Sequence, residues 1–300
     1  MGFNNLSTLC TLRTPSPVEC KNIKTDSKKI DFQEQSSFLN WFSGFTDAEG
    51  NFLISQDRGY IRFRFKISLH IDNLEALNNM KSVLQIGNVT VDKEKKYCSF
   101  VVQDFSDIRD IICPIFVQFP LLTSKSLDFQ DFHKAVLIKN KNPLSEADKN
   151  RIILLKNGMN FSREKFTNFS INSQINVNPD WFIGFLEGEG TFGIKTGSST
   201  YFQVAQKTTS VECLNAIKTF LINLKYMKAP FAAQVDESLE KVVKLPNESK
   251  ILPLNVVSTI NNKSNVMTLA VSSVDALYYY LLPLLDKSKM YTFKAMDFKL

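Results

Sequence analysis

The sequence lacks several residue patterns on which common enzyme classes depend. Its 300 residues include only two histidines, His70 and His133, and five scattered cysteines without a Cys-x-x-Cys pair, so a zinc site of cysteine and histidine is not expected. The odd, unclustered cysteines also argue against a disulfide scaffold and indicate a reducing compartment. No Gly-x-x-x-x-Gly-Lys-Ser/Thr loop or Gly-x-Ser-x-Gly turn is present. Any metal would therefore be a hard cation held by oxygen ligands.

Long apolar runs are also missing. No stretch of about 18 apolar residues occurs, so we expect neither a transmembrane span nor a membrane partner. Hydrophobic residues make up 44% of the chain, which is enough for one large domain or two modest ones. The net charge of +6 permits a polyanionic partner without requiring one.

One string of residues occurs twice in the chain. The segment from Asn40 to Phe52 reads NWFSGFTDAEGNF, and the segment from Asp180 to Phe192 reads DWFIGFLEGEGTF. Trp, Phe, Gly, Phe, an acid, a small residue, Glu, Gly and Phe recur in register. Chance similarity over so specific a string is improbable, so the chain contains an internal repeat.

The same order of elements is predicted after each copy. A hairpin comes first, around a turn at Asp57-Arg58-Gly59 in the first half and near Gly197 in the second. An amphipathic helix, further strands and closing helices follow in both halves. The order predicts an α+β fold made of two αββαββα units.

The chain is expected to divide into four segments. Residues 1–36 indicate a poorly ordered N-terminal tail, with a transit peptide as the alternative. The first repeat spans 37–139 and the second 179–300, joined by a linker, 140–178, with one helix from Ser145 to Lys156. The segment from Pro230 to Asn262 has no clear counterpart in the first half, so a longer hairpin and a mobile loop both remain open.

Small residues recur one helical turn apart on one face of each repeated helix: Gly44, Ala48, Gly184 and Gly188. Such residues let two helix backbones approach closely, which would relate the halves by a pseudo-twofold axis. The alternative is that glycine merely ends these helices, as Gly50 and Gly190 would. That alternative does not explain Gly44 and Gly184 in mid-helix, where glycine costs about 1 kcal/mol.

Glu49 and Glu189 end the two repeated helices. Helix dipoles and mutual repulsion both disfavour negative charge there, so paired carboxylates need a counter-charge. Divalent cations supply it, and metals bridging such a pair could activate water in phosphodiester hydrolysis. The alternative, solvated helix-end glutamates, would be favoured for one copy alone, and the recurrence in both copies argues against it.

The strings FSGFTDAEG (Phe42 to Gly50) and FIGFLEGEG (Phe182 to Gly190) resemble the LAGLIDADG motif of homing endonucleases. The resemblance covers nearly all of residues 37–300 and is greatest to single-chain, double-motif members encoded in fungal mitochondrial introns. It implies a monomer with a saddle of antiparallel sheets and the motif helices at the interface.

The resemblance also implies the roles of the motif acids and the setting of the protein. Glu49 and Glu189 would hold Mg²⁺, with Mn²⁺ or Ca²⁺ able to occupy the site. Asp47 and Glu187 are expected to be structural. A mitochondrial location is implied, and abundant Lys, Phe, Asn and Ile, whose codons are AT-rich, agree with an organellar genome.

Further catalytic residues carry over from the family more loosely. Family members often place a polar residue at the end of the second strand, which is Gln206 in the second half and Leu69 in the first. The repeated Lys-x-x-Asp-Phe string nominates Lys125 and Lys294 for polarising water or stabilising transition-state charge. Surface lysines on an amphipathic helix are the alternative.

Strict alternation from Tyr60 to His70 predicts a strand with an apolar face and a cationic face. A basic strand face is usually only a solvated face, but beside the paired glutamates we expect it to read the major groove of DNA. The expected DNA-binding residues are Arg62, Arg64, Lys66, Ser68, His70, Lys195, Tyr201, Gln203 and Lys207. Because the two faces differ chemically, the target should be long and not palindromic.

These observations favour Mg²⁺-dependent, site-specific cleavage of double-stranded DNA. An RNA maturase that binds its host intron on the same fold is one alternative. A catalytically inactive, sequence-specific DNA-binding protein is the other, and the retention of both glutamates speaks against it.

Overall fold

The computed structural model describes residues 30–141, 143–160, 175–195, 199–226 and 254–299. Most of the expected N-terminal tail, the predicted turn near Gly197 and most of the segment from Pro230 to Asn262 lie outside these residues. Among the described helices, none has the length and apolar character needed to cross a membrane.

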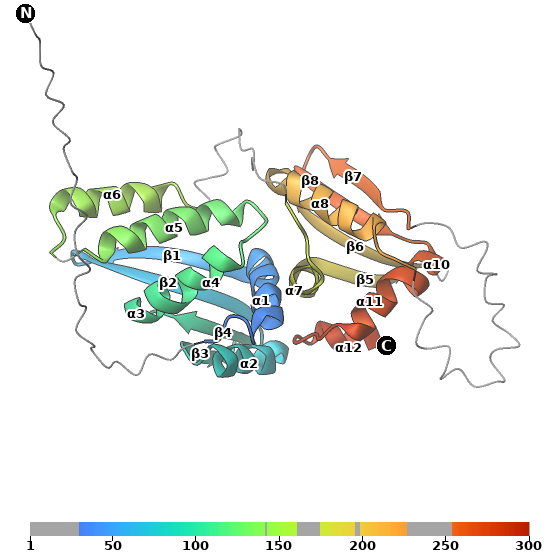
Figure 1. Cartoon of the computed structure of the whole chain (residues 1–300), viewed down its shortest axis with the longest axis horizontal. Helices are drawn as coiled ribbons and strands as arrows, with labels where there is room; N and C mark the ends of the chain where they lie inside the picture. The colour runs from blue at the N-terminus through green and yellow to red at the C-terminus, as the bar shows by residue number, and fades with distance from the viewer. Residues whose placement is uncertain (1–29, 142, 161–174, 196–198, 227–253, 300) are drawn as a thin grey trace, which may run out of the picture.

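Both halves follow the predicted order of elements (Figure 1). The first half contains α1 (Ser36–Glu49), β1 (Gly50–Asp57), β2 (Tyr60–His70), α2 (Leu74–Leu84), β3 (Asn88–Asp92), β4 (Tyr97–Val102), α3 (Phe105–Asp107), the π-helical turn η2 (Ile108–Ile112), α4 (Cys113–Gln118), α5 (Lys125–Lys139) and α6 (Glu146–Asn157). The second half contains α7 (Pro179–Glu189), β5 (Gly190–Lys195), β6 (Ser199–Lys207), α8 (Val211–Ile222), β7 (Val257–Asn261), β8 (Val266–Val271), α10 (Val274–Ala276), the π-helical turn η7 (Leu277–Leu281), α11 (Leu282–Lys287) and α12 (Lys294–Lys299). The α+β prediction is confirmed.

Each half builds one antiparallel sheet of four strands, in the orders β1-β2-β4-β3 and β5-β6-β8-β7. The registers of the two hairpins are equivalent, because Gly50 pairs with Ile67 and Gly190 pairs with Val204. Counting along β2 and β6 from these pairs places Leu69 and Gln206 at the same position. Leu69 and Gln206 are therefore structurally equivalent residues of the two halves.

The predicted turn between β1 and β2 is present as a two-residue connection. Asp57 pairs with Tyr60, and Arg58 and Gly59 have φ angles of 47° and 83°. Two consecutive residues with positive φ form the type of turn whose twist suits a hairpin, and glycine adopts this conformation at no steric cost.

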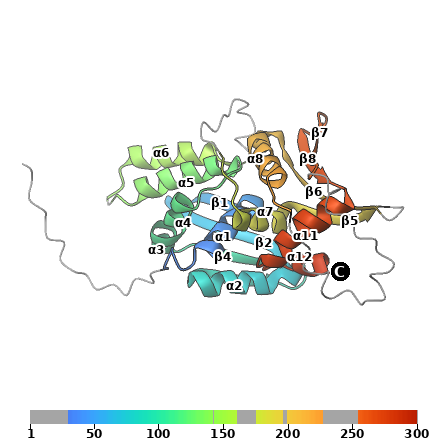
Figure 2. The same cartoon turned by 45° about the vertical axis from the view of Figure 1, so that its right-hand side comes forward.

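One face of each sheet is covered by helices and the other is open. On β2 the buried and exposed residues alternate as predicted. Helices α1, α2 and α5 pack against the buried face of the first sheet, and α7 and α8 against that of the second (Figure 2). Aromatic rings fill the first core, where Phe52 contacts Phe65, Phe116 and Phe129. Each such ring stabilises the fold by about 1.5–3 kcal/mol.

The helix predicted between the halves forms and packs onto the first half. Ser145 caps α6 in a reciprocal capping box with Asp148. Ile152 is fully buried, and α6 lies along α5 in both views (Figures 1 and 2). This part of the expected linker is therefore folded against the first repeat.

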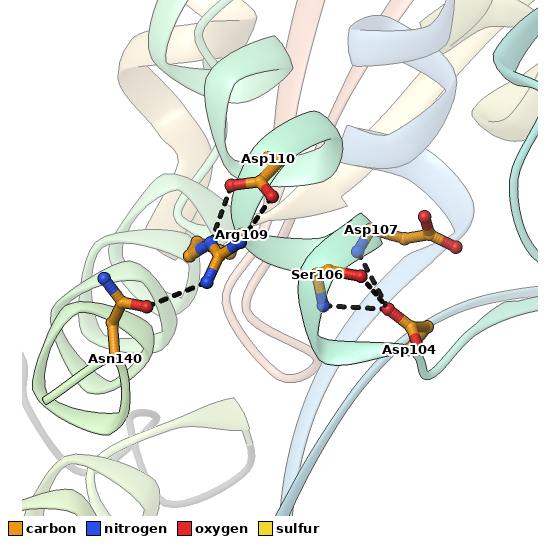
Figure 3. Close-up of polar contacts among 6 residues, drawn as sticks. All are labelled: Asp104, Ser106, Asp107, Arg109, Asp110 and Asn140. Atoms are coloured by element: carbon orange, nitrogen blue, oxygen red, sulfur yellow. Dashed lines mark hydrogen bonds and ion pairs between the residues drawn. The ribbon is translucent and has the colours of Figure 1, made fainter. Parts of the chain in front are cut away.

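Polar contacts fix the short helices of the first half (Figure 3). Asp104 caps α3 by accepting from the backbone nitrogens of Ser106 and Asp107. Arg109 in η2 donates to Asp110 and to the Asn140 side chain at the end of α5. These bonds hold α5, which carries one of the candidate site residues, against the preceding helices.

The expectation that Pro230 to Asn262 lacks a counterpart is wrong for its last residues. Val257–Asn261 forms β7 and pairs with β8 as β3 pairs with β4. Every residue of β7 is exposed. An edge strand without a buried face shows no apolar alternation, and this is why the pattern was not recognised in the sequence.

Candidate active site

The two motif helices, α1 and α7, pack side by side between the sheets (Figures 1 and 2). A Cβ added at Gly44 would lie against the Trp181 carbonyl and 2.9 Å from the Phe185 nitrogen. One added at Gly184 would lie against the Trp41 carbonyl and 2.8 Å from the Phe45 nitrogen. The predicted close approach is therefore present, and only glycine permits it at these two positions.

Glu49 and Glu189 are the last residues of α1 and α7. The Glu49 side chain lies over Gly188 of the other helix, where an added Cβ would be 3.5 Å from its Oε1. Gly188 faces Ala48 at the same contact. The four small residues thus bring the two helix ends, and with them the two carboxylates, together.

Burial raises the pKa of both glutamates, and the charge of Glu49 raises that of Glu189 further. Lys125 and Lys294 act in the opposite direction on both carboxylates. The site therefore contains two carboxylates that repel each other and two ammonium groups that partly compensate them.

The two candidate lysines are each the first residue of a helix, α5 or α12. Lys125 Nζ donates to the carbonyls of Thr46, at 2.9 Å, and Ala48, at 3.3 Å. Lys294 Nζ donates to the carbonyls of Leu186, at 3.4 Å, and Gly188, at 3.3 Å. Each lysine thus binds the C-terminal end of its own motif helix, beside the glutamate. Burial lowers the pKa of Lys125, while Asp47 and the glutamates raise it.

The halves differ at the end of the second strand. Gln206 forms a side-chain hydrogen bond with Glu189, which lowers the pKa of that carboxyl. Leu69 takes the equivalent position beside Glu49 and cannot donate a hydrogen bond. The second half therefore has a polar side chain beside its carboxylate that the first half lacks.

Asp47 and Glu187 are buried and satisfied by hydrogen bonds. Asp47 accepts from the backbone and side chain of Thr123 and from the Trp181 indole. Glu187 accepts from the backbone and side chain of Thr292 and from the Trp41 indole. Burial raises the pKa of both acids, and these bonds oppose the rise.

A hollow beside Glu49 contains residues that the sequence did not single out. Asn73, Lys95, Lys96 and Tyr97 line it together with His70. Tyr97 is a neighbour of Ser68 on the open face, and their hydrogen bond lowers its pKa. No local pattern could have found these residues, because a turn and two strands contribute them.

The predicted DNA-binding residues of the first half lie on the open face of the first sheet. Arg64 and Lys66 line a second hollow with Asn88, Thr90 and Gln103, which sequence reasoning missed. The Nη2 atom of Arg62 lies 3.8 Å from the Oδ2 atom of Asp57. The exposed pair formed by His70 and Asp72 measures 2.9 Å between Nδ1 and Oδ2. Exposed pairs of this kind contribute at most about 1 kcal/mol, so a phosphate can replace the acid.

In the second half, Tyr201, Gln203 and Lys207 occupy alternate positions of β6 on the open face. The Tyr201 ring lies over Gly193 on the neighbouring strand, where a Cβ would be only 2.6 Å from it. The backbone of Lys195 pairs with Ser199 at the far end of the hairpin. The two open faces thus present different side chains.

The donor set can be compared with the requirements of a divalent cation. Within the described residues no three His, Cys, Asp or Glu side chains converge on one point. Mg²⁺ commonly takes one or two protein carboxylates and completes its shell with waters and phosphate oxygens. The pair Glu49 and Glu189, with its unfavourable repulsion, fits this requirement.

Comparisons with known proteins agree with this architecture. The model of the LAGLIDADG endonuclease family matches residues 42–136. The uncharacterized mitochondrial protein RF1 of Saccharomyces cerevisiae is 29% identical over 271 residues, 89% of this chain and 54% of that protein. Probable intron-encoded endonuclease 2 of Neurospora crassa is 31% identical over 150 residues, 48% of this chain and 33% of that protein. The chain thus spans about half of the first relative's length and about a third of the second's.

Solved structures share the whole fold. The homing endonuclease I-GzeII in complex with its DNA target has a TM-score of 0.67 at 23% identity, covering 87% of each chain. I-SmaMI bound to uncleaved DNA in the presence of calcium ions has a TM-score of 0.66 at 18% identity, covering 87% of this chain and 88% of that one. At these identities the matches establish the fold.

Two antiparallel sheets flanking a pair of glycine-packed helices, with a glutamate at each helix end, form the same fold as these solved endonuclease structures. Residues 42–136 match the LAGLIDADG endonuclease family, and the chain is similar to probable intron-encoded endonucleases of Neurospora crassa and Schizosaccharomyces pombe.

Proposed function

We propose that the protein is a site-specific endonuclease that makes a double-strand break in a long, asymmetric DNA target by metal-dependent hydrolysis of phosphodiesters. The observation that carries this proposal is the meeting of Glu49 and Glu189 at the ends of two touching helices, between Lys125 and Lys294. Two carboxylates that repel each other are unfavourable neighbours unless a positive charge lies between them. A cation bound by both glutamates explains why they lie together.

Glu49 and Glu189 would hold Mg²⁺, and Mn²⁺ or Ca²⁺ could occupy the same site. When bound, such a cation activates water and stabilises the leaving oxygen of the phosphodiester. I-SmaMI, which has the same fold, was crystallised on DNA in the presence of calcium ions. Divalent metal use by this chain is part of the proposal.

The remaining groups supply charge and orientation. Lys125 and Lys294 keep positive charge beside the carboxylates, where negative charge develops on the phosphate oxygens during the reaction. Gln206 orients the Glu189 carboxylate by its hydrogen bond. The first half lacks this bond because Leu69 stands there, so the two half-sites are unequal.

The open faces of the sheets would bind the DNA. Arg62, Arg64, Lys66, Ser68 and His70 on β2 present cationic and hydrogen-bonding groups in a row. Tyr201, Gln203 and Lys207 do so on the second sheet, with a different chemistry. Lys195, at the end of β5, is also expected to contribute to DNA binding. A double-stranded ribbon with such a face fits the major groove. Because one chain contains both halves, a monomer suffices, and the similarity to the mitochondrial protein RF1 favours a mitochondrial location.

The test is cleavage, with and without Mg²⁺, of DNA that joins the two sequences flanking the gene, as an uninterrupted target site would. Both strands are expected to be cut only with the metal. Glu49→Gln and Glu189→Gln should abolish cutting and leave DNA affinity within about threefold, while Lys139→Ala, at the end of α5, should cut normally. Tight binding by the wild type with no cleavage in Mg²⁺ would overturn the proposal.

A further inference from the structure

The two halves exchange hydrogen bonds through their tryptophans. Trp41 in α1 donates its indole N–H to Oε2 of Glu187 in α7. Trp181 in α7 donates to Oδ2 of Asp47 in α1, at 3.0 Å. Both rings and both acids are buried. Each motif acid thus has its tryptophan partner in the opposite half.

The same acids hold the turns that precede the lysine helices. Glu187 accepts from the backbone nitrogens of Tyr291, at 2.9 Å, and Thr292, at 2.6 Å. Asp47 accepts from the backbone nitrogens of Leu122, at 2.7 Å, and Thr123, at 3.1 Å. The hydroxyl of each threonine also donates to its acid, at 2.6 Å in both halves.

Each threonine stands two residues before a lysine. A continuous chain therefore runs from Trp41 through Glu187 and Thr292 to Lys294, and an equivalent chain runs from Trp181 through Asp47 and Thr123 to Lys125. The lysines then bind the carbonyls at the ends of the motif helices, beside the glutamates.

The opposite half also holds the residue directly before each lysine. The Phe293 nitrogen donates to Oδ1 of Asn73, at 2.8 Å. The Ser124 nitrogen donates to Oγ of Ser210, at 3.2 Å. Each turn is therefore held twice from across the interface.

We propose that each lysine is positioned by the tryptophan of the opposite half: Lys294 by Trp41 through Glu187, and Lys125 by Trp181 through Asp47. This inference rests on the proposed function and adds a cross-connection between the half-sites. Each lysine serves its own half-site, so a change in one half's tryptophan impairs cleavage at the other half's site.

The acids are suited to this role because every neighbour in these contacts is a donor. Glu187 receives the Trp41 indole, two backbone N–H groups and the Thr292 hydroxyl. A glutamine would turn its NH₂ group toward at least one donor, and an asparagine at position 47 would do the same. Glu187→Gln and Asp47→Asn therefore break the chain with almost no change in volume.

The cleavage test compares the rates at which the two strands are cut in a single turnover. Lys294→Gln and Lys125→Gln establish which strand each lysine serves. Lys294→Gln defines the strand that Lys294 serves. Trp41→Phe and Glu187→Gln should slow the cleavage of that strand by about tenfold or more relative to the cleavage of the other strand. Trp181→Phe and Asp47→Asn should slow the strand affected by Lys125→Gln to a similar extent.

Asn40→Ala is the matched control, because Asn40 accepts from Asn178 across the same interface, at 2.8 Å, but contacts no lysine turn. Its strand ratio should equal that of the wild type. Equal slowing of both strands by the tryptophan and acid variants, or a bias toward the strand of the same half, would overturn the inference. An equal loss of cleavage of both strands in Lys294→Gln and Lys125→Gln would also overturn the inference.

A second measurement does not depend on cleavage. The chain has two tryptophans, so its ¹H–¹⁵N spectrum contains two indole signals, each reporting one bond. Glu187→Gln should shift the Trp41 signal and increase the hydrogen-exchange rate of its indole N–H, while the Trp181 signal stays in place. Asp47→Asn should shift the Trp181 signal and leave the Trp41 signal in place. Unchanged indole signals in both variants would refute the cross-connection even if the wild type cuts DNA. Should the wild type not cut, this spectrum still decides whether the bonds exist.

Discussion

Trp41 and Glu187 belong to different halves of the protein, and the indole nitrogen of the first donates a hydrogen bond to the carboxylate of the second. The pseudo-symmetric bond joins Trp181 and Asp47. Buried charge at an interface is costly unless hydrogen-bonded, and one donor of each acid, the tryptophan indole, reaches it only when the halves are in register. The polar contacts therefore select one docking of α1 on α7, which the glycines alone would leave free to slide.

Replacement of Gly44 by alanine should strongly destabilise the protein. The added methyl group would meet the backbone of Trp181 and Phe185, which cannot move without separating the helices. We expect a loss of about 3 kcal/mol or more in the free energy of unfolding, measured by urea titration followed by circular dichroism. Gly59→Asn at the hairpin tip is the control, since nothing lies within 4 Å there and asparagine tolerates positive φ. Equal stability of Gly44→Ala and wild type would contradict the close contact.

Removal of either carboxylate of the candidate site should stabilise the metal-free protein. Burial raises the pKa of Glu49 and Glu189 above the unfolded value. The folded state therefore binds protons more readily, and the charged form costs folding free energy at neutral pH, a cost that disappears as the pH falls through the folded pKa.

Glu49→Gln or Glu189→Gln removes this cost at neutral pH. The melting temperature without metal should rise by roughly 2–4 °C, which corresponds to about 1 kcal/mol after allowance for partial exposure. Added Mg²⁺ should stabilise the wild type and not the variants. A lower melting temperature of both variants in the chelated sample would show that the carboxylates are not strained.

The unequal half-sites should be visible in the order of strand cleavage. Because Gln206 stands beside Glu189 and Leu69 offers Glu49 no polar group, the wild type is expected to pass through a nicked intermediate. Gln206→Leu should slow the faster strand by about tenfold, and Leu69→Gln should speed the slower one. Leu69→Met tests whether shape alone matters and should leave both rates unchanged. If Gln206→Leu slows neither strand, the asymmetry has no kinetic role.

The open face of the first sheet should contribute base-specific affinity. Arg64 lines a hollow with Lys66, Asn88 and Thr90, where its guanidinium can reach a base edge. Arg64→Ala should cost about 1–3 kcal/mol of binding to the target and relax the preference at one base position, measured by fluorescence anisotropy across single-base variants. Arg151→Ala on the outer helix α6 removes the same charge far from this face and should bind normally. A uniform loss for every variant would assign Arg64 to a phosphate instead.

The sequence alone could predict those features whose physical cause is local or repeated. The order of elements follows from apolar periodicity in two copies. The contact of α1 with α7 follows from glycine in mid-helix, where glycine destabilises the helix unless it permits a close contact. The recurring Lys-x-x-Asp-Phe string indicates that Lys125 and Lys294 occupy equivalent places, and both bind the ends of the motif helices. The alternation on β2 predicts its open face.

Features that depend on tertiary proximity could not be predicted. The bond between Trp41 and Glu187 joins residues 146 positions apart, and no periodicity relates an indole donor to a distant acceptor. Tyr97, Lys95 and Lys96 reach the hollow beside Glu49 because two strands and a turn end there. The exposed edge strand β7 contains no apolar alternation for a pattern to detect.

Trp41 and Trp181 are the only tryptophans in the chain, and both are buried where α1 meets α7. Indole fluorescence moves to longer wavelength when the ring meets water, so the entire tryptophan emission of the protein reports on this one contact. Separation of the halves would therefore appear as a red shift without any added label. A titration that reddens the emission before helical structure is lost would show that the halves part before either unfolds.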